Sequence, residues 1–472
     1  MSYLFHTDDD RREMLASIGA GSVQEIIDLQ VPDAVQLKRP LRLPDSTDEL
    51  NLTRELNQVA ARNASTATHV CFLGGGAYDH FIPAAVDEIA SRGEYYTSYT
   101  PYQAEVSQGN LQVMFEYETL VTQLTGLGVS NASLYDGGSA ATEAVLMALS
   151  IQRQRRKVIT SDVVHPQYRE ILEVYLHNID AELVVVASDA DGSSSTLVEA
   201  IDENTACVLI QSPNFVGRVE SVSQIADAAK ASGALTIQCF DPISLGRLKR
   251  PGDMGVDIAV AEGQCLGNPL AYGGPYLGIM ACRDELVRRL PGRIAGQTTD
   301  RRGKRCWVLT LQTREQHIRR DKATSNICSN QTLLALRASV YLSLLGPHGL
   351  RETTDHCVAK TAYAKSVFAN AHRFEVVHDT PSIKEFVVRD LGEAVPSLLA
   401  TAEENGMLAG IDLTPMTQQA SSGSSPSLLP SQYQNCFLVA VTEQRTRSEI
   451  DQLASVLQSA PQLASVMTDT SL

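Results

Sequence analysis

The feature of this sequence that most constrains its fold is an alternation of apolar, strand-like runs with helical stretches between residues 158 and 282. The strand-like runs are short and continuously apolar, whereas stretches such as 167–178 and 222–232 have the apolar spacing of helices. Continuously apolar strands that alternate with helices predict an α/β fold, in which a mostly parallel sheet has helices on both faces. The predicted strands are Val158–Ser161, Leu183–Ala187, Ala206–Gln211, Leu235–Phe240, Asp257–Ala261 and Tyr276–Cys282.

The rest of the chain predicts an appended N-terminal segment and a smaller C-terminal domain. A chain of 472 residues is long enough for more than one domain. Residues 1–60 are typical of short helices and extended connectors, and residues 61–330 would form the large α/β domain. Residues 331–472 would form a small α+β domain. We expect its first helix to run from near Gln331 to Leu345 and its last helix to begin at Thr446.

Composition excludes several classes of function. A net charge of −16 argues against a general nucleic-acid binder, and no apolar run approaches the roughly 20 residues of a membrane span. The nine cysteines are scattered without a CxxC pair, so the sequence predicts no metal site. The N-terminus lacks the pattern of a signal peptide, and free thiols fit a reducing compartment. We therefore expect a cytoplasmic protein that binds neither nucleic acid nor membrane.

Polar residues follow several of the predicted strands, at the edge where ligands bind in sheets of this kind. These residues are Asp162, His165, Ser212 to Asn214, Asp241 and Gln264. One such residue alone is usually part of a turn, but the whole set indicates a ligand site.

A Gly137-Gly138-Ser139 run opens a buried helix and adds a second indication. Free backbone N–H groups and a hydroxyl at a helix N-terminus favour a bound anion. Ser139 as an ordinary N-cap explains the same run at least as well. Together with Asp241, however, the run matches two of the parts that pyridoxal phosphate (PLP) needs, which are a cradle for its phosphate and a carboxylate for its ring nitrogen.

The third part that PLP needs is a lysine that forms a Schiff base with it. We expect this lysine in the Gly- and Pro-rich turn within Asp257–Pro275, but Gln264 stands there and an amide cannot form the Schiff base. Lys249, the nearest lysine, falls in a predicted loop. The sequence therefore predicts a PLP-type site with no catalytic lysine and no covalent cofactor in this chain.

A run dense in tyrosine precedes these landmarks. Tyrosine offers a flat apolar face with a hydroxyl group, which suits interfaces and pockets. An ordered loop packed on the core is the alternative. The candidate residues are Tyr95, Tyr96, Tyr99, Thr100, Tyr102 and Gln103.

The chain resembles the alpha-subunit branch of the glycine cleavage system P-protein family over almost its whole length. The resemblance lies in Tyr95–Asn110, Tyr135–Ala144, Pro291–Gly296 and Leu309–Cys328, of which the last is long and highly specific. It implies the type I fold of PLP-dependent transferases, like that of aspartate aminotransferase. The activity it implies is that of glycine dehydrogenase (aminomethyl-transferring), which decarboxylates glycine and passes the aminomethyl group to the lipoyl arm of H-protein.

The resemblance also implies an α2β2 heterotetramer with PLP on the beta subunit. The tyrosine loop, with Arg314 and His317, would line the partner's channel or dock H-protein. Two alternatives remain open: a purely structural or regulatory subunit, and a standalone PLP enzyme that uses an unexpected lysine. In the implied assembly, the vestigial cofactor-pocket residues of this chain would be Gly137, Gly138, Ser139, His165, Asp241 and Gln264.

Overall fold

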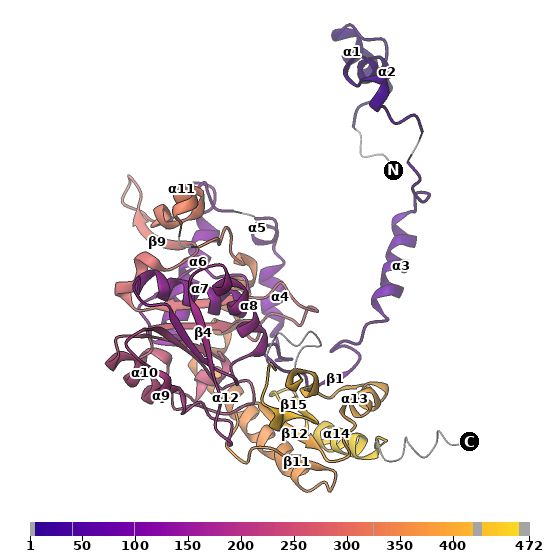
Figure 1. Cartoon of the computed structure of the whole chain (residues 1–472). Coiled ribbons are helices and arrows are strands. Elements are labelled where there is room, and N and C mark those ends of the chain that lie inside the picture. The colour runs from indigo at the N-terminus through magenta and orange to yellow at the C-terminus, as the bar shows by residue number, and fades with distance from the viewer. Residues whose placement is uncertain (1–4, 40, 99, 324, 419–426, 462–472) are drawn as a thin grey trace, which may run out of the picture. The chain divides into compact units, whose positions relative to one another are not determined.

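The computed structural model describes residues 5–39, 41–98, 100–323, 325–418 and 427–461 (Figure 1). The chain divides into two compact units, residues 1–63 and 64–472.

The N-terminal unit consists of short helices that bury none of its described residues. Thr7 caps the first helix in a capping box with Asp10, as expected from the aspartates that follow it. The helices are α1 (Asp8–Ser17), α2 (Val23–Gln30), η1 (Asp33–Val35) and α3 (Glu49–Ala60).

The second unit is built on a seven-stranded sheet with the order β2-β8-β7-β6-β5-β3-β4. The strands from β3 to β7 run parallel, and β8 is antiparallel to both of its neighbours. The predicted mostly parallel sheet is therefore confirmed. Its strands are β2 (Val129–Ser130), β3 (Lys157–Ser161), β4 (Glu182–Val186), β5 (Thr205–Ser212), β6 (Leu235–Phe240), β7 (Ile258–Glu262) and β8 (Gly278–Cys282).

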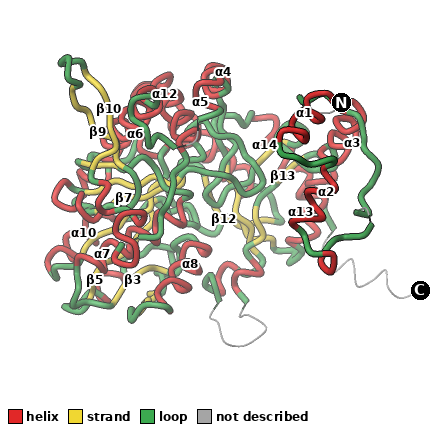
Figure 2. Tube along the Cα trace, turned by 90° about the horizontal axis from the view of Figure 1, so that it is seen from above, coloured by secondary structure: helices red, strands yellow, loops and turns green. Residues whose placement is uncertain are grey.

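Alternate residues of β7 and β8 face two helical layers. Figure 2 shows helices around the strands of this unit. Val260 and Met280 pack with α7 and α8, whereas Ala261 and Ile279 pack with α6 and the first half of α12. Both faces are apolar because both are covered. The covering helices are α4 (Ala84–Ala90), α5 (Gly93–Tyr96), α6 (Gln108–Thr125), α7 (Gly137–Ile151), α8 (Pro166–His177), α9 (Leu197–Ala200), α10 (Val222–Ala231) and α12 (Thr332–Ala369).

Helix α12 differs from its prediction. The expected break occurs at Gly346, whose φ of 56° and ψ of −172° are not helical, but a second helix follows Pro347 and continues to Ala369. Proline is tolerated there because it lies in the first turn of that second helix.

A smaller, antiparallel four-stranded sheet has the order β11-β12-β15-β14 and is covered by α13 and α14. Residues 70–71 pair with residues 407–408, so a segment far away in the sequence joins this part of the unit. Within the described residues, no helix has the length and apolar character to cross a membrane. The remaining elements are β1 (Val70–Cys71), β9 (Ile294–Thr299), β10 (Arg305–Thr310), α11 (Gln316–Arg319), β11 (Phe374–Val376), β12 (Glu385–Asp390), α13 (Val395–Glu404), β13 (Met407–Leu408), β14 (Ile411–Asp412), β15 (Cys436–Ala440), α14 (Arg447–Ser459) and the 3-10 turns η2 (Ile243–Gly246), η3 (Pro251–Met254), η4 (Asp284–Arg289), η5 (Gln312–Arg314), η6 (Arg320–Lys322), η7 (Thr414–Thr417) and η8 (Ser431–Tyr433).

Candidate functional site

The N-terminus of α7, predicted as a cradle for phosphate, is capped by carboxylates of the chain itself. Asp136 is the N-cap, and it accepts hydrogen bonds from the backbone N–H of Ser139 at 2.8 Å and from its hydroxyl at 2.9 Å. Glu262 accepts the N–H of Gly137 at 2.9 Å. The interpretation of Ser139 as the N-cap is therefore wrong, because Ser139 lies inside the first turn.

Glu262 binds as an anionic ligand would. Besides Gly137, it accepts the backbone N–H of Gln264 at 2.9 Å and that of Leu277 at 3.0 Å. Burial raises the pKa of this carboxyl to about 7, although the three N–H donors oppose the shift. The positive end of the α7 dipole faces this side chain, so the anion site is already filled.

Asp241 lies where the sequence predicts it, at the end of β6, but its partner is a lysine of the same chain. The Lys384 ammonium is 2.9 Å from Asp241 Oδ1 and lies 3.5 Å from the centre of the Tyr78 ring. Burial lowers the pKa of Lys384, but the Asp241 carboxylate together with Cys265 and Cys357 outweighs burial, so the net shift is upward. Lys384 therefore occupies one oxygen of the carboxylate that a pyridine nitrogen would require, and the other oxygen, Oδ2, is buried without a hydrogen-bond partner among the described residues.

His165 stacks on Tyr168 with ring centres 4.5 Å apart and planes 16° apart. Its Nε2 lies 2.8 Å from the carbonyl oxygen of Gly75, and burial lowers its pKa to about 4, so the ring is neutral. A Cβ atom on Gly137 would lie 2.2 Å from the Tyr168 hydroxyl. The tyrosine ring thus fills the space between His165 and the start of α7.

Gln264 is fully buried and uses its amide completely. Its Oε1 accepts the N–H of Tyr78 at 2.8 Å, and its Nε2 donates to the carbonyls of Tyr78 at 3.0 Å and Asn268 at 2.8 Å. A lysine at this position could not accept the N–H of Tyr78. Gln264 is therefore a structural residue that connects the backbone of Tyr78 to that of Asn268.

The cavity that remains has a volume of about 40 Å³. Pockets for drug-sized ligands and cofactors have volumes of about 300 Å³ or more. Because Glu262 caps the start of α7, Tyr168 holds the stacking position, Lys384 pairs with one oxygen of Asp241 and only this small volume is left, the residues present do not fit PLP. Among the side chains that line the cavity are His165, Tyr168, Asp241, Glu262, Lys384 and Glu385.

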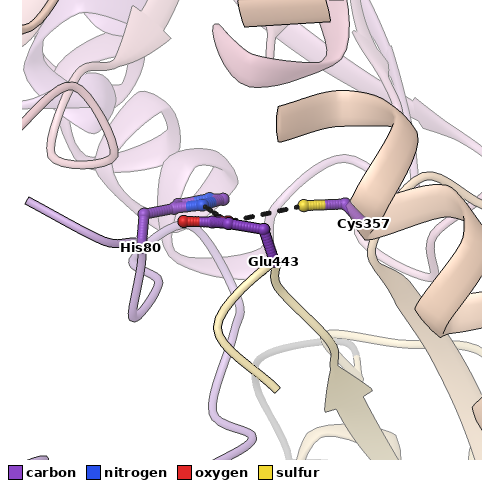
Figure 3. A group of neighbouring side chains, drawn as sticks. All are labelled: His80, Cys357 and Glu443. Carbon is purple, nitrogen blue, oxygen red and sulfur yellow. Dashed lines mark hydrogen bonds and ion pairs between the residues drawn. The ribbon is translucent and has the colours of Figure 1, made fainter. Parts of the chain in front are cut away.

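A second polar group adjoins Lys384 (Figure 3). His80, Cys357 and Glu443 offer ligand atoms within 4.8 Å of one another, with His80 Nδ1 only 2.6 Å from Glu443 Oε2. Lys384 lies 3.1 Å from His80 Nε2, so it donates there and leaves Nδ1–H to donate to Glu443. Burial raises the pKa of Glu443, but the hydrogen bond and charge interaction with His80 and the backbone N–H donors together outweigh burial and lower that pKa to about 2. The hydrogen bonds and the adjacent Lys384 ammonium account for the arrangement of these three side chains without a metal ion.

The tyrosine loop is largely exposed, with Tyr96 67% and Tyr102 60% accessible. The Tyr102 ring lies edge-on to His317 at 6.1 Å and under the Arg293 guanidinium at 5.4 Å. The structure therefore brings the loop together with the Leu309–Cys328 run. Tyr95 is half-buried in α5.

The tyrosine loop contains three further candidate residues, of which the structure describes two. Thr100 is half-buried and Gln103 exposed, and their carbonyls accept backbone N–H groups within the loop. Tyr99 lies outside the described residues.

Arg314 faces inward. Its guanidinium donates to the carbonyl oxygens of Leu290, Gly292 and Leu311, the latter two at 3.0 Å. Burial lowers its pKa. These contacts hold the turn after Leu290, and the predicted role of Arg314 at a partner's site stays a prediction.

Sequence reasoning missed the three residues that close the pocket, Tyr168, Glu262 and Lys384. Two of them leave a weak signal, because Glu262 is the polar last residue of the apolar strand β7 and Lys384 directly precedes β12. The pairing of Lys384 with Asp241 joins residues 143 positions apart, which no local pattern indicates.

Comparison with known proteins gives one consistent result. The family model described as glycine cleavage system P-protein matches residues 1–457. A curated relative from Desulforamulus reducens, "Probable glycine dehydrogenase (decarboxylating) subunit 1", is 46% identical and covers 97% of this chain and 99% of its own. A protein with the same description from Carboxydothermus hydrogenoformans is 47% identical over the same shares of both chains.

Comparison with solved structures points to the same family. An inhibitor-bound glycine decarboxylase (P-protein) of the glycine cleavage system superposes with a TM-score of 0.86 at 37% identity, covering 97% of this chain and 99% of that one. A Lactobacillus brevis glutamate decarboxylase, at 11% identity, has a TM-score of 0.66 and covers 92% of this chain and 95% of that one, so it shares the fold alone. The fold is the type I fold of PLP-dependent enzymes. Because the family model spans nearly the whole sequence and the relatives match at both ends, this chain belongs to the glycine cleavage system P-protein family.

Proposed function

We propose that this chain is the cofactor-free subunit 1 of a two-subunit glycine dehydrogenase (decarboxylating). The observation that carries the proposal is the pocket closed by Tyr168, Glu262 and Lys384, in a chain whose relatives are named subunit 1. A subunit so named has a second subunit, and the PLP that acts as the electron sink in enzymes of this fold would be bound there.

The complex would be an α2β2 heterotetramer that decarboxylates glycine and passes the aminomethyl group to the lipoyl arm of H-protein. In this assembly the present chain would supply a surface rather than a nucleophile. The exposed aromatic faces of Tyr96 and Tyr102, with His317 beside them, suit the wall of a partner's channel. We expect the complex in the cytoplasm.

The direct test is reconstitution. The chain and its second subunit would be purified apart, then mixed with glycine and lipoylated H-protein, and release of CO2 measured. We expect neither subunit to release CO2 alone and the mixture to do so. Activity of this chain by itself would contradict the proposal.

A purely structural or regulatory role predicts a different response to mutation. If the loop lines the partner's site, Tyr96→Ala and Tyr102→Ala lower turnover at a fixed concentration of assembled complex. Phe81→Ala is a matched control, because it removes an aromatic ring that is also 61% exposed but lies outside the loop. Unchanged turnover in both loop variants would leave only the structural role.

The standalone PLP enzyme finds little support. Lys384 is the lysine nearest to the closed pocket, but it is bound to Asp241, the carboxylate that the ring nitrogen itself would need. Lys249, weighed from the sequence, lies exposed in the loop between η2 and η3.

A further inference from the structure

An open cleft of about 710 Å³ lies at the C-terminal end of α7 and is lined by five cations and one carboxylate. The cations come from three separate segments of the chain, the end of α7, η4, and the α11–η6 turn. They are Arg153, Arg156, Arg289, Arg319 and Lys322, and the carboxylate is Asp180.

None of these five side chains has an ion pair or a hydrogen bond to any described residue. Arg153 and Arg156 follow the last turn of α7, where positive charge is favourable to the helix dipole. That effect does not explain Arg289, Arg319 and Lys322, which converge on the same place from elsewhere. Like charges brought together repel one another, so these five cations destabilise each other in the free chain. The chain as a whole is acidic, with a net charge of −16. Carboxylates of a bound partner would neutralise the cluster.

An apolar hollow of about 400 Å³ adjoins the cleft and shares Leu146 and Ile179 with it. Val174 and Tyr175 of α8 line this hollow and are 63% and 41% exposed. Exposed apolar side chains next to arginines form the usual composition of a protein interface.

We propose that the cleft and its apolar hollow receive an acidic segment of the second subunit, with carboxylates among the five cations and an apolar side chain on Val174 and Tyr175. The inference rests on the proposed function, which supplies the permanent partner. A small anion has no reason to need the apolar hollow, and permanent subunit interfaces are the more apolar class. The apolar hollow therefore favours the second subunit over a small anion and over a transient carrier protein.

The experiment measures the dissociation constant of the full-length chain and its purified second subunit by titration calorimetry at low and high salt. In Arg153→Glu/Arg156→Glu we expect that constant to rise by about tenfold or more, with a weaker salt dependence than in the wild type. Arg319→Glu/Lys322→Glu, on the other side of the cleft, is expected to do the same. Tyr175→Ser weakens binding without changing its salt dependence.

Lys249→Glu/Arg351→Glu is the matched control, because it makes the same change of net charge at exposed residues that do not line the cleft. All four variants change exposed side chains, so the free chain should still unfold cooperatively, and only Arg153→Glu/Arg156→Glu should lose a little stability because it reverses charges favourable to the α7 dipole.

If both cleft variants bind the second subunit like the control, the assignment is wrong. It is equally wrong if binding is unchanged but the KM for H-protein rises, since the cleft would then belong to the carrier. A wild-type pair that associates tightly but does not release CO2 from glycine would refute the proposed function instead, and leave the cleft to be judged by its binding data.

Discussion

Lys384, Glu262 and Tyr168 each take the place of one part of a cofactor. Lys384 provides the cation for Asp241, Glu262 provides the anion for the start of α7, and Tyr168 provides the ring beside His165. The pocket thus contains the Lys384–Asp241 ion pair in place of PLP. Most of its polar groups are buried and hydrogen-bonded within the chain, whereas Asp241 Oδ2 and His165 Nδ1 are buried without a partner among the described residues.

Replacing Lys384 with methionine tests this balance, because the change keeps the length of the side chain and removes its charge. Asp241 would be left buried without its cation, which costs about 3–5 kcal/mol in the free energy of unfolding. Asp241→Asn in the same chain should recover part of that cost, measured by denaturant unfolding. Fully additive losses in the two single variants and the double variant would show that the pair is not coupled.

Gln264→Lys tests whether the missing lysine alone explains the missing cofactor. We expect no Schiff base with PLP, since Lys384 and Tyr168 still fill the pocket. The chain should also lose about 2–4 kcal/mol of stability, because buried backbone groups of Tyr78 and Asn268 lose their partner. Visible absorbance after incubation with PLP, trapped by borohydride in this variant, would refute the closed pocket.

Glu443 gives a pH dependence whose sign follows from its pKa. The pKa is lowered from 4.5 to about 2 in the folded chain, so the ionised carboxylate stabilises the fold above pH 4.5, and that contribution is lost as the pH falls from 4.5 to about 2. Glu443→Gln should therefore cost up to about 3 kcal/mol at neutral pH and almost nothing near pH 2. Denaturant unfolding of the wild type and of Glu443→Gln between pH 2 and pH 7 measures this difference in stability. A difference that does not change with pH would contradict the role of the Glu443–His80 pair.

At the scale of elements, the apolar pattern predicts the sheet well. The strands β3 to β7 end within about one residue of their predicted bounds, because buried parallel strands are apolar throughout and their flanks are not. The start of α7 was harder, since Asp136 and Ser139 are both good capping residues and only the geometry selects Asp136. The second half of α12 was missed because Gly346-Pro347 reads as a helix end, whereas here it is a kink.

The N-terminal unit gives a prediction at this scale. Its described residues are all partly or fully exposed, and α3 presents Leu50, Leu56 and Val59, which are 59%, 58% and 47% accessible. Deletion of residues 1–63 should leave the thermal unfolding of the remaining chain unchanged, because it removes no buried core. We expect it to weaken binding to the second subunit, since exposed apolar faces of this size mark contact surfaces. A lower unfolding temperature in the truncated chain would contradict this.

At the scale of the whole molecule, the chain keeps the complete type I fold while its cofactor pocket is closed. The sequence could predict the fold and the strand-end position of Asp241, because those depend on local pattern, whereas the missing Schiff-base lysine stays a prediction. It could not predict that Lys384 and Tyr168 fill the space, because those contacts depend on how distant segments meet. The fold is therefore retained here in a chain whose pocket does not fit the cofactor of that fold.

The central claim is that the cofactor of the complex is bound outside this chain. Its most direct test is borohydride reduction of the active, reconstituted complex, followed by mass spectrometry of each subunit. The expected result is a phosphopyridoxyl group on one lysine of the second subunit and an unmodified mass for this chain. A phosphopyridoxyl group on any lysine of this chain, Lys384 included, would contradict the account.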